Sequence, residues 1–219
     1  MKFFQWQRKG QKLLSNKIIQ SLVLFLVFTL IFGCGKTEQK KVEEQPVKNF
    51  NDPSVMLQES QKVLGKSAKT AYSGTFEDKT KNEIVAGLEI DTKDELGIKF
   101  ALLKIVGNKL EKGFETALLD GSITDGYTSK INLPPTDYEL LYYNSQDYYV
   151  GSGGGEVFSY LIDFKLKKVY YAHLIIEPKT ISLFLSENID NQEIKDFFIK
   201  NFRKDYPSLT LVSKDFILD

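Results

Sequence analysis

The hydrophobic and polar positions divide the chain into three segments. An apolar run without any charged residue covers residues 18–32. The next stretch, 36–52, is rich in Lys, Glu and Gln and has almost nothing to bury, which is typical of a disordered tether. From residue 53 onward, apolar positions recur with helical or alternating spacing. The pattern therefore predicts a leader at 1–33, a tether at 34–52 and one globular domain at 53–219.

Two segments of the domain have helical character. Asn-Asp-Pro at 51–53 supplies a capping side chain followed by a proline, and predicts a helix over 53–69. A second helix is predicted over 191–204. Its apolar residues recur at steps of three and four and form one stripe: Ile194, Phe197, Phe198 and Phe202.

The rest of the domain favours β-strands separated by turn residues such as Gly107-Asn108 and Asn144-Ser145. Strands are predicted at 71–77, 83–91, 97–106, 109–119, 123–131, 138–143, 147–150, 156–164, 168–177 and 180–186, with a final strand from 209–212 and 216–218. Short connections imply antiparallel pairing. The segments 157–164 and 169–176 are apolar on both faces and are expected at the centre of a covered sheet. The predicted fold class is α+β, a mainly antiparallel β-sheet with an N-terminal and a C-terminal helix packed on it.

The amino-terminal segment has the pattern of an export signal. Five basic residues and no acidic one accompany the apolar run: Lys2, Arg8, Lys9, Lys12 and Lys17. The run is shorter than the roughly 20 residues that a bilayer-spanning helix needs. It ends in Ile-Phe-Gly-Cys-Gly at 31–35, which resembles the lipobox of bacterial lipoproteins. Gly33 and Cys34 match that pattern, whereas Phe32 stands where a small residue is common.

The resemblance to bacterial lipoproteins implies cleavage before Cys34 and attachment of lipid, including palmitate, to that cysteine. The domain would then be lipid-anchored on the exported side of the bacterial cell envelope. Gly35 stands where aspartate would favour inner-membrane retention in enteric-type sorting, so the resemblance favours the outer membrane and the periplasm. The alternative is an uncleaved amino-terminal anchor in which Cys34 is an ordinary small apolar residue.

Processing would change the composition of the chain. The whole chain has 29 basic and 29 acidic residues, and loss of the five basic leader residues leaves 24 against 29, a net charge of about −5. This acidic balance argues against a nucleic-acid partner and against electrostatic adhesion to anionic lipid. Arg203 would be the one remaining arginine, which disfavours a phosphate-recognition enzyme. With Cys34 acylated, no disulfide or thiolate metal site can form, and we expect no cofactor.

Few patterns in the domain point to catalysis. The glycine-rich stretch 151–155 precedes a predicted strand rather than a helix and lacks the lysine of a phosphate loop, so we expect a hairpin loop that lets a ligand approach its backbone. His173 is the only histidine. Its place in a central strand favours a half-buried, hydrogen-bonded histidine. The alternative is an envelope hydrolase that pairs it with Ser152 or a carboxylate. The acidic stretch 120–126 lacks the ligand spacing of a calcium loop and favours a hairpin turn.

The distribution of tyrosine is unusual, because eight of the 11 tyrosines lie between Tyr138 and Tyr171. Sheet packing explains many of them, but adjacent pairs point to opposite faces of a strand, so several are expected outside the core. Exposed tyrosines suit contacts to sugars or to a protein partner. The candidate ligand-binding residues are Tyr142, Tyr148, Gly153, Gly154 and Tyr170.

These observations favour a lipid-anchored envelope protein of a non-enzymatic binding or assembly type. Its expected contacts are the membrane, through the lipid anchor, and an envelope protein or glycan partner. The alternative function is the hydrolase that would use His173.

Overall fold

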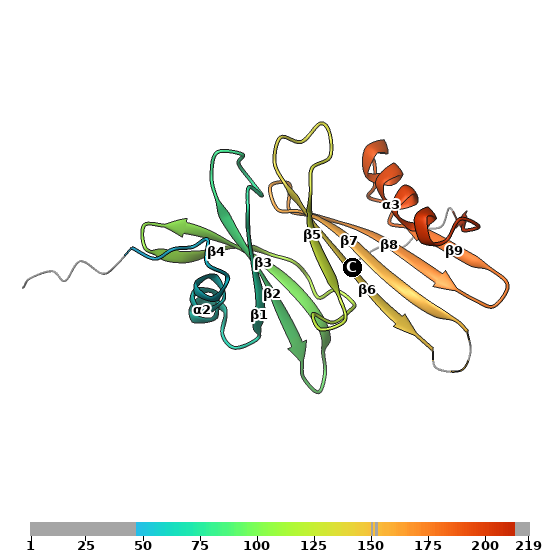
Figure 1. Cartoon of the computed structure of the whole chain (residues 1–219), viewed down its shortest axis with the longest axis horizontal. Helices are drawn as coiled ribbons and strands as arrows, with labels where there is room; N and C mark the ends of the chain where they lie inside the picture. Colours follow the sequence, from blue (N-terminus) through green and yellow to red (C-terminus); the bar gives the residue numbers. More distant parts are fainter. Residues whose placement is uncertain (1–46, 150, 152, 213–219) are drawn as a thin grey trace, which may run out of the picture. The chain divides into compact units, whose positions relative to one another are not determined.

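The computed structural model describes residues 47–149, 151 and 153–212, which fold as two helices and ten strands (Figure 1). In chain order these are α2 (Pro53–Leu64), β1 (Ala68–Gly74), β2 (Glu83–Asp91), β3 (Leu96–Val106), β4 (Lys109–Glu115), β5 (Tyr127–Ile131), β6 (Leu140–Tyr148), β7 (Gly155–Asp163), β8 (Lys168–Ile176), β9 (Ile181–Leu185), α3 (Gln192–Asp205) and β10 (Thr210–Val212). The expected leader, Cys34 and Ser152 lie outside the described residues.

The strands form two sheets. One has four strands in the order β1-β2-β3-β4, and the other has six in the order β10-β9-β8-β7-β6-β5. Neighbouring strands are antiparallel except for β10, which pairs in parallel with β9 because α3 returns the chain to the same end of the sheet. The predicted α+β class, with a helix near each end of the described chain, is confirmed.

The helices and sheets pack as four layers, α2, the four-stranded sheet, the six-stranded sheet and α3 (Figure 1). Alternation along each strand separates the contacts. In β6, Leu140 and Tyr142 pack in the cluster with α3, whereas Leu141 and Tyr143 pack in the cluster between the sheets. Phe100 of the smaller sheet meets Tyr143 of the larger one at 5.4 Å between ring centroids. Both faces of the six-stranded sheet are therefore buried, as the apolar pattern of β7 and β8 predicts.

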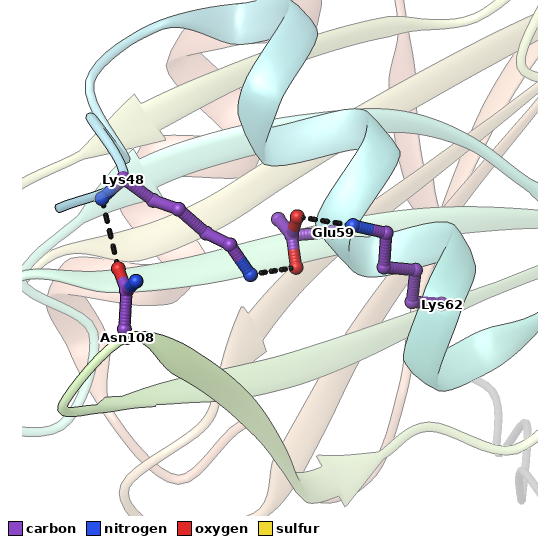
Figure 2. A network of polar contacts seen from close by, with 4 residues as sticks. All are labelled: Lys48, Glu59, Lys62 and Asn108. Carbon is purple, nitrogen blue, oxygen red and sulfur yellow. Dashed lines mark hydrogen bonds and ion pairs between the residues drawn. The ribbon is translucent and has the colours of Figure 1, made fainter. Parts of the chain in front are cut away.

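The packed domain begins earlier than the apolar pattern indicates. Phe50 is 8 % exposed and joins the cluster of Met56 beneath α2. The backbone N–H of Lys48 donates to Asn108 Oδ1 at 2.8 Å, and the Lys48 ammonium lies 2.7 Å from Glu59 Oε2 (Figure 2). The expected tether over 34–52 therefore overlaps the domain from residue 48 onward. Phe50 and Lys48 make the contacts, which the polar composition of the segment did not indicate.

Two predicted boundaries were wrong for local reasons. Helix α2 ends at Leu64 rather than at residue 69, because Gly65 has a φ of +83° and its N–H closes on the Gln61 carbonyl. Asn144 and Ser145 do not form a turn but lie inside β6, where they pair with Ser159 and Phe158 of β7. The predicted strands at 138–143 and 147–150 are thus replaced by one strand that ends at Tyr148.

Candidate functional site

The carboxyl-terminal end of β6 separates two surface depressions. The acidic cleft, of about 820 Å³, lies on the side facing the four-stranded sheet. The tyrosine hollow, of about 260 Å³, lies on the side of α3. Gln146 lines both. The cleft falls within the ~300–1,000 Å³ that is usual for ligand pockets.

Both sheets contribute to the acidic cleft. Its walls carry the carboxylates of Glu89, Asp91, Asp120, Asp125 and Asp147, against the ammonium groups of Lys66 and Lys69. Within the described part of the chain, none of these five carboxylates forms an ion pair. The excess of negative charge makes the cleft attractive to cations and to basic segments.

A row of three stacked tyrosines supports the floor of the cleft. Tyr143, Tyr160 and Tyr171 come from adjacent strands, with ring centroids 6.2 and 4.8 Å apart. The Tyr160 hydroxyl donates to Asp120 Oδ2 at 3.2 Å and accepts the Asp120 N–H at 3.1 Å, while the Tyr143 hydroxyl donates to the Ser122 carbonyl at 2.9 Å. Burial raises the pKa of all three phenols, so they stay neutral. The row thereby fixes the 120–126 connection at the wall of the cleft.

His173 lies behind the cleft on the same face of the larger sheet. Its ring stacks on Phe158, which lines the cleft, with 4.8 Å between centroids. His173 Nε2 lies 2.9 Å from Glu156 Oε2, and the other oxygen of Glu156 accepts the Tyr149 hydroxyl. That hydrogen bond raises the pKa of Tyr149 to about 12. The histidine is 8 % exposed within β8, and the carboxylate beside it is that of Glu156.

The tyrosine hollow is built from β5, β6, β7 and α3. Its residues are Tyr127, Tyr142, Asn144, Gln146, Val157, Asn201, Phe202, Asp205 and Tyr206. At its base the Tyr142 hydroxyl accepts Nδ2 of Asn201 at 2.8 Å and Nδ2 of Asn144 at 3.3 Å. Asn144 Nδ2 also donates to Ser159 Oγ at 2.6 Å. Burial raises the pKa of Tyr142, so its hydroxyl remains protonated within this network.

Tyr148 closes the rim of the hollow. Its hydroxyl donates to Gln146 Oε1 at 2.8 Å and lies 3.2 Å from the hydroxyl of Tyr206, at the end of α3. Burial and this contact raise the pKa of Tyr206 to about 12. Tyr127, on the edge strand β5, is 63 % exposed and Tyr148 is 54 % exposed, so two aromatic rings are open to solvent here.

The structure separates the predicted ligand-binding residues. Tyr148 is exposed, and Gly153 and Gly154 lie in the hairpin between β6 and β7. Tyr142 and Tyr170, which were expected outside the core, are only 4 % and 3 % exposed, because α3 covers the face of the sheet on which they lie. Their expected exposure was wrong, although Tyr142 forms the base of the hollow.

Several residues at the hollow carried no sequence signal. Tyr127 lies 11 positions before the tyrosine-rich segment and reaches the hollow through the edge strand β5. Asn201, Asp205 and Tyr206 lie 30 or more positions after that segment and reach the hollow through the packing of α3. An alternation of apolar residues indicates faces of single elements, and it does not indicate which elements meet.

Neither a metal centre nor a membrane span is found among the residues that the structure describes. Over residues 47–149, 151 and 153–212, no group of three or more His, Cys, Asp and Glu side chains is placed to hold a metal ion. In the same residues, no helix has the length and apolar content needed to cross a membrane.

The chain matches no protein-family model, no curated protein and no solved structure. Its function therefore has to be inferred from the geometry of the cleft, the hollow and the histidine pair.

Proposed function

We propose that this chain is a lipid-anchored protein of the bacterial cell envelope that acts by binding rather than by catalysis. Cys34 carries the lipid, on the exported side, with the outer membrane favoured by Gly35. The observation that supports a binding role is the presence of two open depressions on either side of the β6 end, one with uncompensated carboxylates and one with exposed tyrosines.

The point at which the chain enters the domain agrees with this role. The backbone of Lys48 is hydrogen-bonded to Asn108, in the turn after β3 (Figure 2). Gly97, near the start of β3, lines the acidic cleft. Strands rise about 3.3 Å per residue, so these two ends of β3 lie roughly 30 Å apart. The chain therefore enters the domain, at Lys48, at the end of the smaller sheet opposite to the cleft.

The charge of the cleft indicates the chemistry of one partner. Asp91, Asp125 and Asp147 are exposed and form no ion pair among the described residues, so a basic segment of an envelope protein would gain Coulomb energy on entering. Such an attraction acts on association rates and weakens with salt.

The anchor is tested by labelling cells with radioactive palmitate. Wild type is expected to incorporate label and Cys34→Ala to lose it. Label retained in Cys34→Ala would overturn the lipid anchor.

The binding role is tested by affinity capture of the full-length protein from its own envelope. The cleft variant Asp125→Asn/Asp147→Asn is compared with Glu111→Gln/Glu193→Gln, which removes two exposed charges elsewhere. A partner that wild type and the control retain, and that the cleft variant loses, is the expected result. Equal retention by both double variants would contradict binding through the cleft.

The hydrolase remains a second candidate because His173 and Glu156 form a hydrogen-bonded pair at 2.9 Å, the base and orienting carboxylate of a triad. His173→Ala distinguishes the two functions. Loss of a hydrolytic activity with the fold intact would favour the enzyme, whereas a lower midpoint of unfolding with partner binding retained would favour a packing role.

A further inference from the structure

We propose that the tyrosine hollow binds a short neutral oligosaccharide. This specifies a ligand for the binding role proposed above, and it rests on that role. Three features of the hollow support it: exposed aromatic rings, unused amide groups and a small volume.

The exposed rings supply the surface for stacking. Tyr127 is 63 % exposed and Tyr148 is 54 % exposed. An aromatic ring has an electron-rich face, which attracts the weakly positive C–H groups on one side of a pyranose ring. Tyrosine also loses little conformational entropy when it binds, because it has only two side-chain torsions.

The amides supply hydrogen bonds of both kinds. The side-chain nitrogens of Asn144 and Asn201 donate hydrogen bonds within the base of the hollow. The Oδ1 atoms of these two residues are left as acceptors for a ligand. The Oε1 of Gln146 accepts from Tyr148, so its Nε2 remains as a donor. Asp205 adds an exposed carboxylate acceptor. Sugar hydroxyls donate and accept at once, and they match this mixture better than a purely acidic or basic ligand does.

The base of the hollow is already ordered before any ligand arrives. Tyr142 is 4 % exposed and accepts two amide donors, with Ser159 Oγ 3.2 Å from its hydroxyl. These contacts hold Asn144 and Asn201 from two different elements in fixed positions. Preorganised polar groups lose less entropy on binding, which favours recognition of a small polar molecule.

The size of the hollow argues against a protein in this place. A stable protein interface buries about 800 Å² on each partner. A depression of 260 Å³ is instead suited to one or two sugar rings, with a third ring lying on Tyr127 outside it. A protein partner is therefore an outcome of the test rather than the proposal.

The experiment is isothermal titration calorimetry of the purified full-length protein in detergent, with maltotriose and with triacetylchitotriose as the two titrated sugars. We expect wild type to bind at least one of them at millimolar concentration or below. Tyr127→Ala is expected to weaken binding about tenfold or more, as removal of an aromatic contact residue does. Tyr149→Ala is the matched control, because Tyr149 is 45 % exposed but its hydroxyl contacts Glu156 rather than the hollow.

Three results would overturn the inference. The first is absence of binding to either trisaccharide, and the second is an equal loss in Tyr127→Ala and Tyr149→Ala. The third is an envelope protein that Tyr127→Ala fails to retain while neither sugar binds, which would show that the hollow docks a protein. Each of these leaves palmitate labelling at Cys34 and partner loss in the cleft variant unchanged, so failure of the oligosaccharide is distinguishable from failure of the proposed function.

Discussion

Lys48 places its ammonium nitrogen 2.7 Å from a carboxylate oxygen of Glu59, a side chain that is only 8 % exposed on helix α2. Lys62 lies 2.6 Å from the other oxygen of the same carboxylate. The ion pair between Lys48 and Glu59 holds the first residues of the packed chain against α2 (Figure 2). A buried carboxylate with two charged donors is stabilising only while it is ionised, which makes its contribution dependent on pH.

Glu59→Gln is expected to lower the free energy of unfolding by about 1–3 kcal/mol at neutral pH. Hydrogen bonds from Lys48 and then Lys62 hold the pKa of Glu59 below its ordinary value of 4.5. The stabilisation is thus fully present above pH 4.5 and is lost as the pH falls through the lowered value. Urea unfolding over a pH series should show the gap between wild type and variant closing in acid. A gap independent of pH would contradict the role of the charge.

Glu83→Gln is expected to show the opposite dependence on pH. Glu83 is 4 % exposed, and burial raises its pKa above 4.5 despite the Glu77 N–H that its Oε2 accepts at 2.7 Å. The cost of burying its charge is therefore present above the raised pKa and disappears below 4.5. In the same urea series, wild type should gain stability relative to Glu83→Gln as the pH falls. Parallel pH profiles for the Glu59 and Glu83 variants would refute this assignment.

Ser60→Ala is expected to leave stability unchanged or to raise it by up to about 1 kcal/mol. Ser60 is fully buried in α2, and its hydroxyl has no hydrogen-bond partner among the described residues. Removing an unsatisfied polar group removes its desolvation cost. Ser159→Ala is the matched control: it is equally buried but accepts from Asn144, so it should lose about 1 kcal/mol. Thermal unfolding of both variants checks the contrast, and equal losses would be the contrary result.

Gly121→Ala is expected to destabilise the protein more than Gly107→Ala does. Both glycines have positive φ, +124° and +59°, but a Cβ at Gly121 would clash with the Tyr143 hydroxyl, whereas the space at Gly107 is open. Adding Tyr143→Phe to Gly121→Ala should recover part of the loss, because it removes the clashing oxygen. Near-ultraviolet circular dichroism and denaturant midpoints report on the tyrosine row and on stability. If the double variant were no more stable than Gly121→Ala alone, the clash with the Tyr143 hydroxyl would not be the cause of the lost stability.

Local patterns predicted the elements well where one element decides the outcome. Strand β2 runs over Glu83–Asp91, as predicted, and the turn at Gly107-Asn108 joins β3 to β4. The apolar stripe of α3 packs on the larger sheet through Ile194, Phe198 and Phe202. In these cases the side chains that specify the element are the same ones that bury it.

The candidate site depended on packing that local patterns do not contain. Tyr142 and Tyr170 were expected outside the core because adjacent tyrosines point to opposite faces of a strand, but α3 covers the face on which both lie. The tyrosine hollow joins Tyr127 to Tyr206, which are 79 positions apart in the sequence. Such a site requires the register of β5 on β6 and the position of α3, and both arise from long-range contacts.

The fastening of Lys48 to Asn108 and Glu59 has a mechanical consequence. Any pull on the chain ahead of Val47 is transmitted first to two side-chain contacts and to the buried ring of Phe50, rather than to the edge of a sheet. Under load, this first segment should detach before α2 and before any strand. Residues 47–52 would then lengthen under force, while the end of the domain that carries the cleft and the hollow keeps its shape.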